Sequence, residues 1–218
     1  MLMFAYPKQA EVNRVVPKSK IYAHAKTSKR LKELFVNQVG EILWKYKLSP
    51  ETINLPARNG INEIQVFEIA TKTPNIDEDV LLSIDKAIPF PLVFQLVHDG
   101  KVQFAVSYKR PSDADSSKWV IESTFRTEPE PENAERPVLP VALDLASLYE
   151  QILRRFSPLP PRRGEGIRDH VARLTEIQKK KEERSLLQTK LRKEKQFNRK
   201  VQLNAALRSI SHELENLK

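Results

Sequence analysis

The chain has 218 residues, 40% of them apolar, which is enough for one sizeable core with an appendage but short for two ordinary domains. It has no cysteine and only four scattered histidines, so disulfides and thiolate metal sites are excluded, and we expect no metal and no cofactor. No run of eighteen apolar residues and no signal-peptide pattern occurs, which predicts a soluble cytoplasmic protein without a membrane partner.

The first third of the chain begins with irregular sequence and a short predicted helix at residues 8–13. Thr27 or Ser28 can cap a longer helix, predicted to end near Leu48-Ser49-Pro50. Its apolar residues recur at intervals of three and four: Leu31, Leu34, Phe35, Val39, Ile42, Leu43 and Tyr46.

Two strands are predicted next. A short apolar piece at residues 53–55 and the alternating stretch at 61–72 flank Arg58-Asn59-Gly60, a turn signal, and this arrangement is typical of a hairpin. Three acids at residues 77–79 then favour the start of a helix that runs to about residue 88, because carboxylates suit the positive end of the helix dipole.

The clearest local pattern is a second hairpin at residues 91–109. Its two β-rich runs meet at Asp99-Gly100, a dipeptide typical of the type I′ turn, which needs positive φ at both central residues. A further strand is expected at 118–127, a surface loop at 128–137 and a helix at 141–156, which the prolines at 158–161 must end. We therefore predict an α/β or α+β fold, a mixed sheet flanked by helices, over residues 1–161.

Residues 162–218 form a predicted helical arm with most of the net charge. They hold 16 Lys and Arg against 8 Asp and Glu, and no proline or glycine follows Gly166. Large apolar residues recur near the end at intervals of four and three, which is typical of a coiled-coil seam: Leu203, Leu207, Ile210, Leu214 and Leu217.

That seam does not join the apolar stripe at the front of the arm, so a stutter or a bend is predicted near residues 194–200. An exposed seam of this size needs a partner, and we expect it to bind one. Three arrangements stay open: a dimer, a hairpin within one chain and a helix induced by a partner.

A dense basic cluster lies at the predicted bend. Its members, which would contact nucleic-acid phosphates without reading bases, are Arg192, Lys193, Lys195, Arg199 and Lys200. The plainer interpretation is a solvated helix face around one apolar residue, because a lone Phe197 offers no stacking platform.

Several stretches of the chain resemble one uncharacterised bacterial family. They are AEVNRVVPKSKIY (10–22), LWKYKLSPETINLP (43–56), IDKAIPFPLVFQL (84–96), LDLASLYEQILRRF (143–156) and KEKQFNRKVQLN (193–204). They are similar to domain-of-unknown-function family 4391, DUF4391. The resemblance implies a setting beside DNA methyltransferases and helicases in defence operons, and it assigns no catalytic residue.

Such a setting invites a search for a metal-dependent nuclease with paired carboxylates and a lysine. The best candidates are Glu68 and Lys72, which would share one face of a strand, with Glu51 or Glu41 as the second carboxylate. The nuclease pattern has one residue between acid and lysine, whereas three lie between these two. His98, at the tip of the second hairpin, is expected to be exposed.

The hypothesis we favour is a non-enzymatic accessory or adaptor subunit of a DNA-modification, restriction or phage-defence system. Its expected partner is a helicase or methyltransferase from the same operon, bound through the C-terminal arm. A homodimer through that arm, a metal-dependent nuclease and a module that binds DNA non-specifically are the alternatives.

Overall fold

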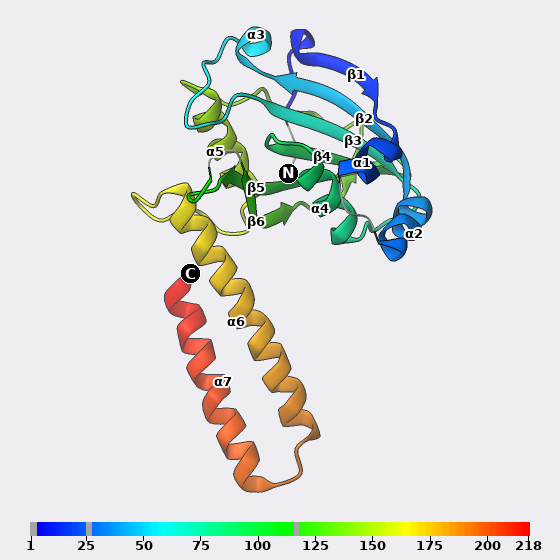
Figure 1. The fold of residues 1–218 in the computed structure, drawn as a ribbon. Coiled ribbons are helices and arrows are strands. Elements are labelled where there is room, and N and C mark those ends of the chain that lie inside the picture. The colour runs from blue at the N-terminus through cyan, green and yellow to red at the C-terminus, as the bar shows by residue number, and fades with distance from the viewer. Residues whose placement is uncertain (1–3, 25–27, 116–117) are drawn as a thin grey trace. The chain divides into compact units, whose positions relative to one another are not determined.

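The computed structural model describes residues 4–24, 28–115 and 118–218 (Figure 1). The chain divides into two compact units, Met1–Ser157 and Pro158–Lys218, close to the boundary predicted after Pro161. The first unit contains the sheet, and the second consists of two long helices. In the described ranges no helix is both long and apolar enough to cross a membrane.

A mixed sheet organises the first unit. In the described residues its strands are β1 (Glu11–Val15), β2 (Val39–Leu48), β3 (Ile64–Thr71), β4 (Leu92–His98), β5 (Lys101–Pro111), β6 (Trp119–Arg126) and β7 (Glu130–Pro131). The first six lie side by side in chain order, and β7 pairs with β5. Strands β3 and β4 run parallel, and the other pairings are antiparallel.

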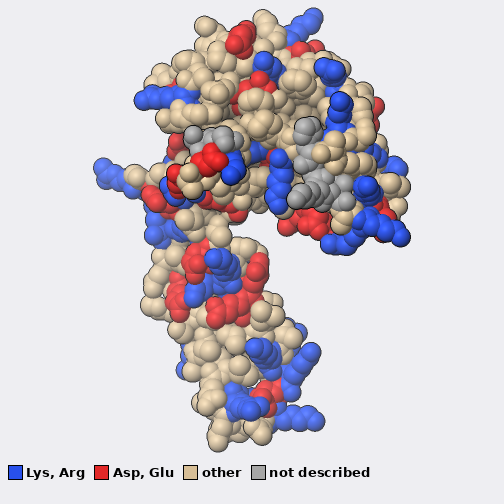
Figure 2. Space-filling model, viewed as in Figure 1, with Lys and Arg blue, Asp and Glu red and all other residues tan. Residues whose placement is uncertain are grey.

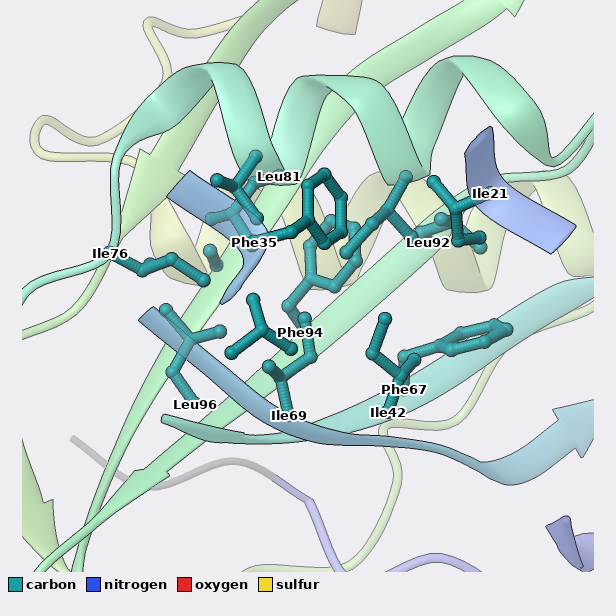
Figure 3. Packing of buried hydrophobic residues seen from close by; sticks show 14 residues of the cluster. Ile21, Phe35, Ile42, Phe67, Ile69, Ile76, Leu81, Leu92, Phe94 and Leu96 are labelled. Carbon is teal, nitrogen blue, oxygen red and sulfur yellow. The ribbon is translucent and has the colours of Figure 1, made fainter. Parts of the chain in front are cut away.

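Helices cover both faces of this sheet. The helical elements of the unit are η1 (Lys8–Ala10), α1 (Lys18–His24), α2 (Lys29–Gln38), α3 (Pro50–Ile53), α4 (Glu78–Ala87) and α5 (Leu145–Phe156). Figure 3 shows the main core, in which Ile21 of α1, Phe35 of α2 and Leu81 of α4 pack on Ile69 and Phe94 of the sheet. On the opposite face Phe156 of α5 lies beside Phe104. The predicted class, a mixed sheet flanked by helices with long C-terminal helices, is confirmed.

The hairpin predicted at Asp99-Gly100 is confirmed. Both residues have positive φ, 46° and 71°, as a type I′ turn requires, and they join β4 to β5. Ser28 caps α2 by accepting a hydrogen bond from the Leu31 amide at 3.2 Å, whereas Thr27 lies outside the described residues. Strands β3 and β6 and helices α4 and α5 also form where the sequence predicts them.

The predicted helix from residue 28 to residue 48 is wrong in its second half. Helix α2 ends at Gln38 and the chain continues directly as β2. Residues 42, 44, 46 and 48 are all apolar or aromatic, so this stretch fits a strand period as well as a helix period. Pairing with β1 and β3 decides the outcome, since it places the stretch between two other strands of the sheet.

Two shorter predictions also need correction. Residues 8–13 form a 3₁₀ turn followed by β1, and Pro50–Ile53 is a helical turn where a strand was expected nearby. The turn has a reciprocal capping box between Ser49 and Thr52, with proline at its first position. The predicted first hairpin is therefore wrong, and β3 pairs with β2.

A buried ion pair joins α4 to β5. The ammonium of Lys109 lies 3.0 Å from the carboxylate of Asp85 and also donates to the carbonyls of Asp85 and Ile88. Each of the two charged side chains is only 1% exposed. The strand bulges at this point, and the Tyr149 hydroxyl accepts from the Lys109 amide and donates to the Ser107 carbonyl. The polar groups of the bulge are thus hydrogen-bonded within the core.

Candidate functional site: the tip of a helical hairpin

The second unit is a helical hairpin. Helix α6 (Ile167–Lys193) and helix α7 (Phe197–Leu217) pack against each other along their length, joined by a short turn (Figure 1). The predicted bend near residues 194–200 is confirmed, since the helix breaks at residues 194–196. Of the arrangements left open by the sequence, the structure has the hairpin within one chain.

Glu194 stabilises the turn between the helices. Its carboxylate accepts hydrogen bonds from the backbone amides of Gln196 at 2.9 Å and Lys195 at 2.8 Å. These backbone hydrogen bonds lower the pKa of Glu194. A carboxylate here also suits the N-terminus of α7, where amides lack helical partners.

Arginines close the other end of the hairpin. Arg173 of α6 donates to the Leu217 carbonyl at 3.1 Å, and Arg162 donates to the Asn216 carbonyl at 2.7 Å. Arg173 is held by the carboxylate of Glu165, at 2.6 Å and 2.8 Å, and these hydrogen bonds keep the pKa of Glu165 well below its usual range. The last carbonyls of α7 are therefore capped by cations, as a helix C-terminus favours.

The predicted seam divides along α7. Ile210 and Leu214 are buried against Ile177 of α6, with Leu217 partly buried beside them. Leu203 and Leu207, nearer the turn, are partly exposed. Much of the predicted partner-binding seam is thus in contact with α6 of the same chain.

The predicted nucleic-acid residues gather around the turn. Arg192 and Lys193 end α6, Lys195 lies in the turn, and Arg199 and Lys200 belong to the first turn of α7; all five are exposed. Figure 2 shows Lys and Arg side chains grouped at this end of the hairpin. The cluster is therefore brought together by the fold as well as by the sequence.

A notch of about 390 Å³ lies between the helices at this tip. Lys190 and Lys193 line it from α6, and Arg199, Gln202 and Leu203 line it from α7. We call residues 190–203 the hairpin tip. The sequence alone does not point to Lys190, because only the fold-back of the hairpin brings it next to α7. Glu194 also lines the notch; its carboxylate lies 3.9 Å from Arg199 and accepts hydrogen bonds from the backbone of the turn.

Apolar side chains accompany the charge at the tip. Phe197 is 78% exposed and Val201 is 52% exposed, on the first turns of α7. A single exposed ring offers no platform for successive bases, so it is the charge at the tip, and not Phe197, that favours contact with phosphates.

The nuclease candidates have separate partners. Glu68 forms an ion pair with Lys45 of β2, while the carboxylate of Glu51 accepts a hydrogen bond from the Ser49 hydroxyl at 2.6 Å. Lys72 lies beyond the end of β3 and donates to the Val36 carbonyl at 2.8 Å, so the expected sharing of a strand face with Glu68 is wrong. Among the residues that the structure describes, no three His, Cys, Asp or Glu side chains are placed to hold one metal ion.

The sequence of residues 4–214 matches a family described as "Domain of unknown function (DUF4391)". The chain belongs to the DUF4391 family. The match includes both compact units and the hairpin tip, so the arm of this DUF4391 protein is part of the family domain.

Beyond this family no likeness to a characterised protein is found. No curated protein and no solved structure matches the chain.

Proposed function

We propose that this protein is a non-enzymatic accessory subunit that holds its partners through the hairpin tip. The contact favoured by the charge is the phosphate backbone of DNA, and the setting is a DNA-modification, restriction or phage-defence system in the cytoplasm. A helicase or methyltransferase subunit is the expected protein partner, as the family resemblance implies.

The observation that carries this proposal is the charge of residues 190–200. They contain six Lys and Arg and one Glu, all within one exposed end of the hairpin. Each lysine or arginine that neutralises a phosphate releases counterions, which favours binding at low salt whatever the base sequence. Of the three cations around the notch, Lys190 and Lys193 come from α6 and Arg199 comes from α7. Three contacts at once are therefore a reasonable number.

Three phosphate contacts predict how binding depends on salt. Each contributes a slope of about −0.9 in log affinity against log salt, so the whole tip predicts about −2.7. Such an arm binds weakly at physiological salt unless a helicase or methyltransferase adds contacts of its own. Base discrimination is expected to be negligible, because phosphate contacts carry no sequence information.

The test is a titration of labelled duplex DNA, followed by fluorescence anisotropy over a range of salt. The variant Lys193→Glu/Arg199→Glu reverses two of the three charges around the notch, and Lys179→Glu/Lys181→Glu makes the same change at exposed positions in the middle of α6. Loss of two contacts should change the slope from about −2.7 to about −0.9. The affinity for DNA at 0.1 M salt should then fall by about 60-fold. The control variant should lose far less affinity for DNA. Equal losses in both variants, or a strong sequence preference, would contradict the proposal.

The nuclease alternative has weaker support. Glu68 is engaged with Lys45, and Lys72 bonds to a carbonyl of α2, so neither is arranged around a shared ion. Magnesium-dependent cleavage of DNA by the wild type that disappears in Glu68→Ala would revive this alternative.

A further inference from the structure

A second site lies in the first unit, at the end of the parallel strand pair. Strands β3 and β4 end at Thr71 and His98, and the chain passes between the two strands through α4. A cavity of about 300 Å³ opens at these two residues. In open α/β sheets, ligands commonly bind outside the carboxyl ends of the parallel strands. We call this cavity the strand-end pocket.

The lining of the pocket is apolar where it meets the core. Ile76 and Leu96 line it and belong to the main hydrophobic core, where each is 5% exposed. Pro74 and Pro129 add further apolar surface. A bound molecule would therefore place a carbon skeleton against this wall, as in most small-molecule sites.

Polar groups occur on the opposite side, at the turn between β4 and β5. His98 and Lys101 are directly paired across the hairpin, so their side chains lie next to each other on one face. The imidazole is oriented by Thr71, whose carbonyl accepts from Nδ1 at 3.0 Å. The expectation that His98 is exposed is wrong, because its side chain is only 24% exposed. The ring thus lies fixed at the pocket, where it can report on a bound ligand.

Both signs of charge occur at the pocket. Asp99 lines its solvent-exposed side, where its 90% exposed carboxylate lies 3.5 Å from Nε2 of His98. No ion pair is found for Lys101 among the described residues, so its ammonium is available to a ligand. Arg126 of β6 donates to the Ile76 carbonyl at 3.2 Å, and its Nε and Nη2 atoms are buried without a hydrogen-bond partner in the described part of the chain. Arg126 does not line the pocket, but it brings a second, partly buried cation to the backbone of Ile76 in its wall.

We propose that the strand-end pocket binds a small organic anion. Its carboxylate or phosphate group is recognised by the ammonium of Lys101, and its apolar body rests on Ile76 and Leu96. Gln103, which donates to the Thr127 carbonyl at 2.8 Å, keeps its side-chain oxygen as an acceptor for a ligand hydroxyl or amide. This site is independent of the hairpin tip, so either proposal can fail without the other.

Three matched probes test the proposal: phenyl phosphate, benzoate and the neutral benzamide. Binding is followed on the full chain by the NMR signal of the His98 ring, which is assigned by its loss in His98→Gln. At least one anion should shift the signal saturably, with a dissociation constant in the millimolar range expected of such small ligands, and benzamide should not. The stronger of the two anions tells whether phosphate or carboxylate is preferred.

Variants locate the binding. Lys101→Met should weaken the anion by about 10-fold or more, which is the usual worth of a hydrogen bond from a charged group. Lys86→Met, at an exposed lysine on α4, is the matched control and should leave binding unchanged. Unchanged circular dichroism shows that both variants fold. The proposal is overturned if neither anion shifts His98, if benzamide binds equally well, or if both lysine variants behave alike.

Discussion

The buried pair of Lys109 and Asp85 gives the sharpest prediction about the fold. In Lys109→Met the carboxylate and two backbone carbonyls lose their donor inside the core. Breaking a buried pair by removing one partner costs about 3–5 kcal/mol, a large share of the 5–15 kcal/mol that is typical of a whole protein. Asp85→Asn should cost a similar amount at neutral pH, because it leaves a buried ammonium without its carboxylate.

The two single variants should respond to pH in opposite ways. Burial raises the pKa of Asp85 and lowers the pKa of Lys109, and in each case the partner's charge opposes the shift. In Lys109→Met the pKa of Asp85 rises further, so the folded state binds a proton that the unfolded state has released. Stability then falls as the pH rises above the ordinary carboxyl range, by at most about 1.4 kcal/mol per pH unit.

In Asp85→Asn the pKa of Lys109 falls further below its ordinary value. The unfolded state then binds the extra proton, so stability rises with pH up to the ordinary lysine range. Lys109→Met/Asp85→Leu removes both charges, and its stability should be nearly independent of pH over this interval and within about 2 kcal/mol of the wild type or above it.

Urea denaturation followed by tryptophan fluorescence measures these differences from about pH 5 to about pH 9. Both tryptophans of the chain, Trp44 and Trp119, lie in the first unit, so the signal reports on that unit alone. Single variants that cost less than about 1 kcal/mol, or that share one direction of pH dependence, would refute the reasoning.

Three further predictions concern the bulge and the hairpin. Tyr149→Phe removes the hydroxyl that pairs the polar groups of the β5 bulge, and should cost about 1–3 kcal/mol in the same denaturation assay. Leu214→Asp places a charge in the contact between α6 and α7, and should reduce the helical signal in circular dichroism; an unchanged signal would mean that the contact is not needed. Because the pKa of Glu165 is depressed in the folded state, the stability from its pair with Arg173 is present above the ordinary glutamate range and lost as the pH falls below it. Glu165→Gln should therefore be less stable than the wild type near neutral pH and lose less helicity on acidification, and identical acid titrations of the two proteins would contradict this.

Local signals in the sequence were sufficient for some elements and not for others. The hairpin at Asp99-Gly100 is decided by two residues that tolerate positive φ, so its position is visible without any tertiary information. The change from α2 to β2 is different, because residues 39–48 fit both periods and only the neighbouring strands decide between them. Ser49, Pro50 and Thr52 are typical of the start of a helix, but the apolar residues at 53–55 favour a strand, and the strand was predicted.

The same distinction applies to the sites. The basic cluster at residues 192–200 is continuous in sequence and was predicted from charge alone. The notch was not predicted, because Lys190 and Arg199 meet only after the helix breaks and folds back. The strand-end pocket was missed for a similar reason, since Thr71, Ile76 and Lys101 come from three elements whose meeting depends on the parallel pairing of β3 and β4.

The fold-back also limits how the arm can bind a partner. Opening the hairpin to expose Ile210 and Leu214 would cost about 1.5–3 kcal/mol for each side chain returned to water. A partner that binds this seam must therefore supply at least that much binding free energy. A second copy of the chain avoids the cost if the two copies exchange α7, because every contact with α6 is then remade across the dimer. In such a dimer the turn at residues 194–196 would straighten, and the notch between Lys190 and Arg199 would disappear. If the chain dimerises in this way, self-association through the seam would compete with phosphate binding at the notch, and added DNA should lower the mass of the free protein measured by light scattering.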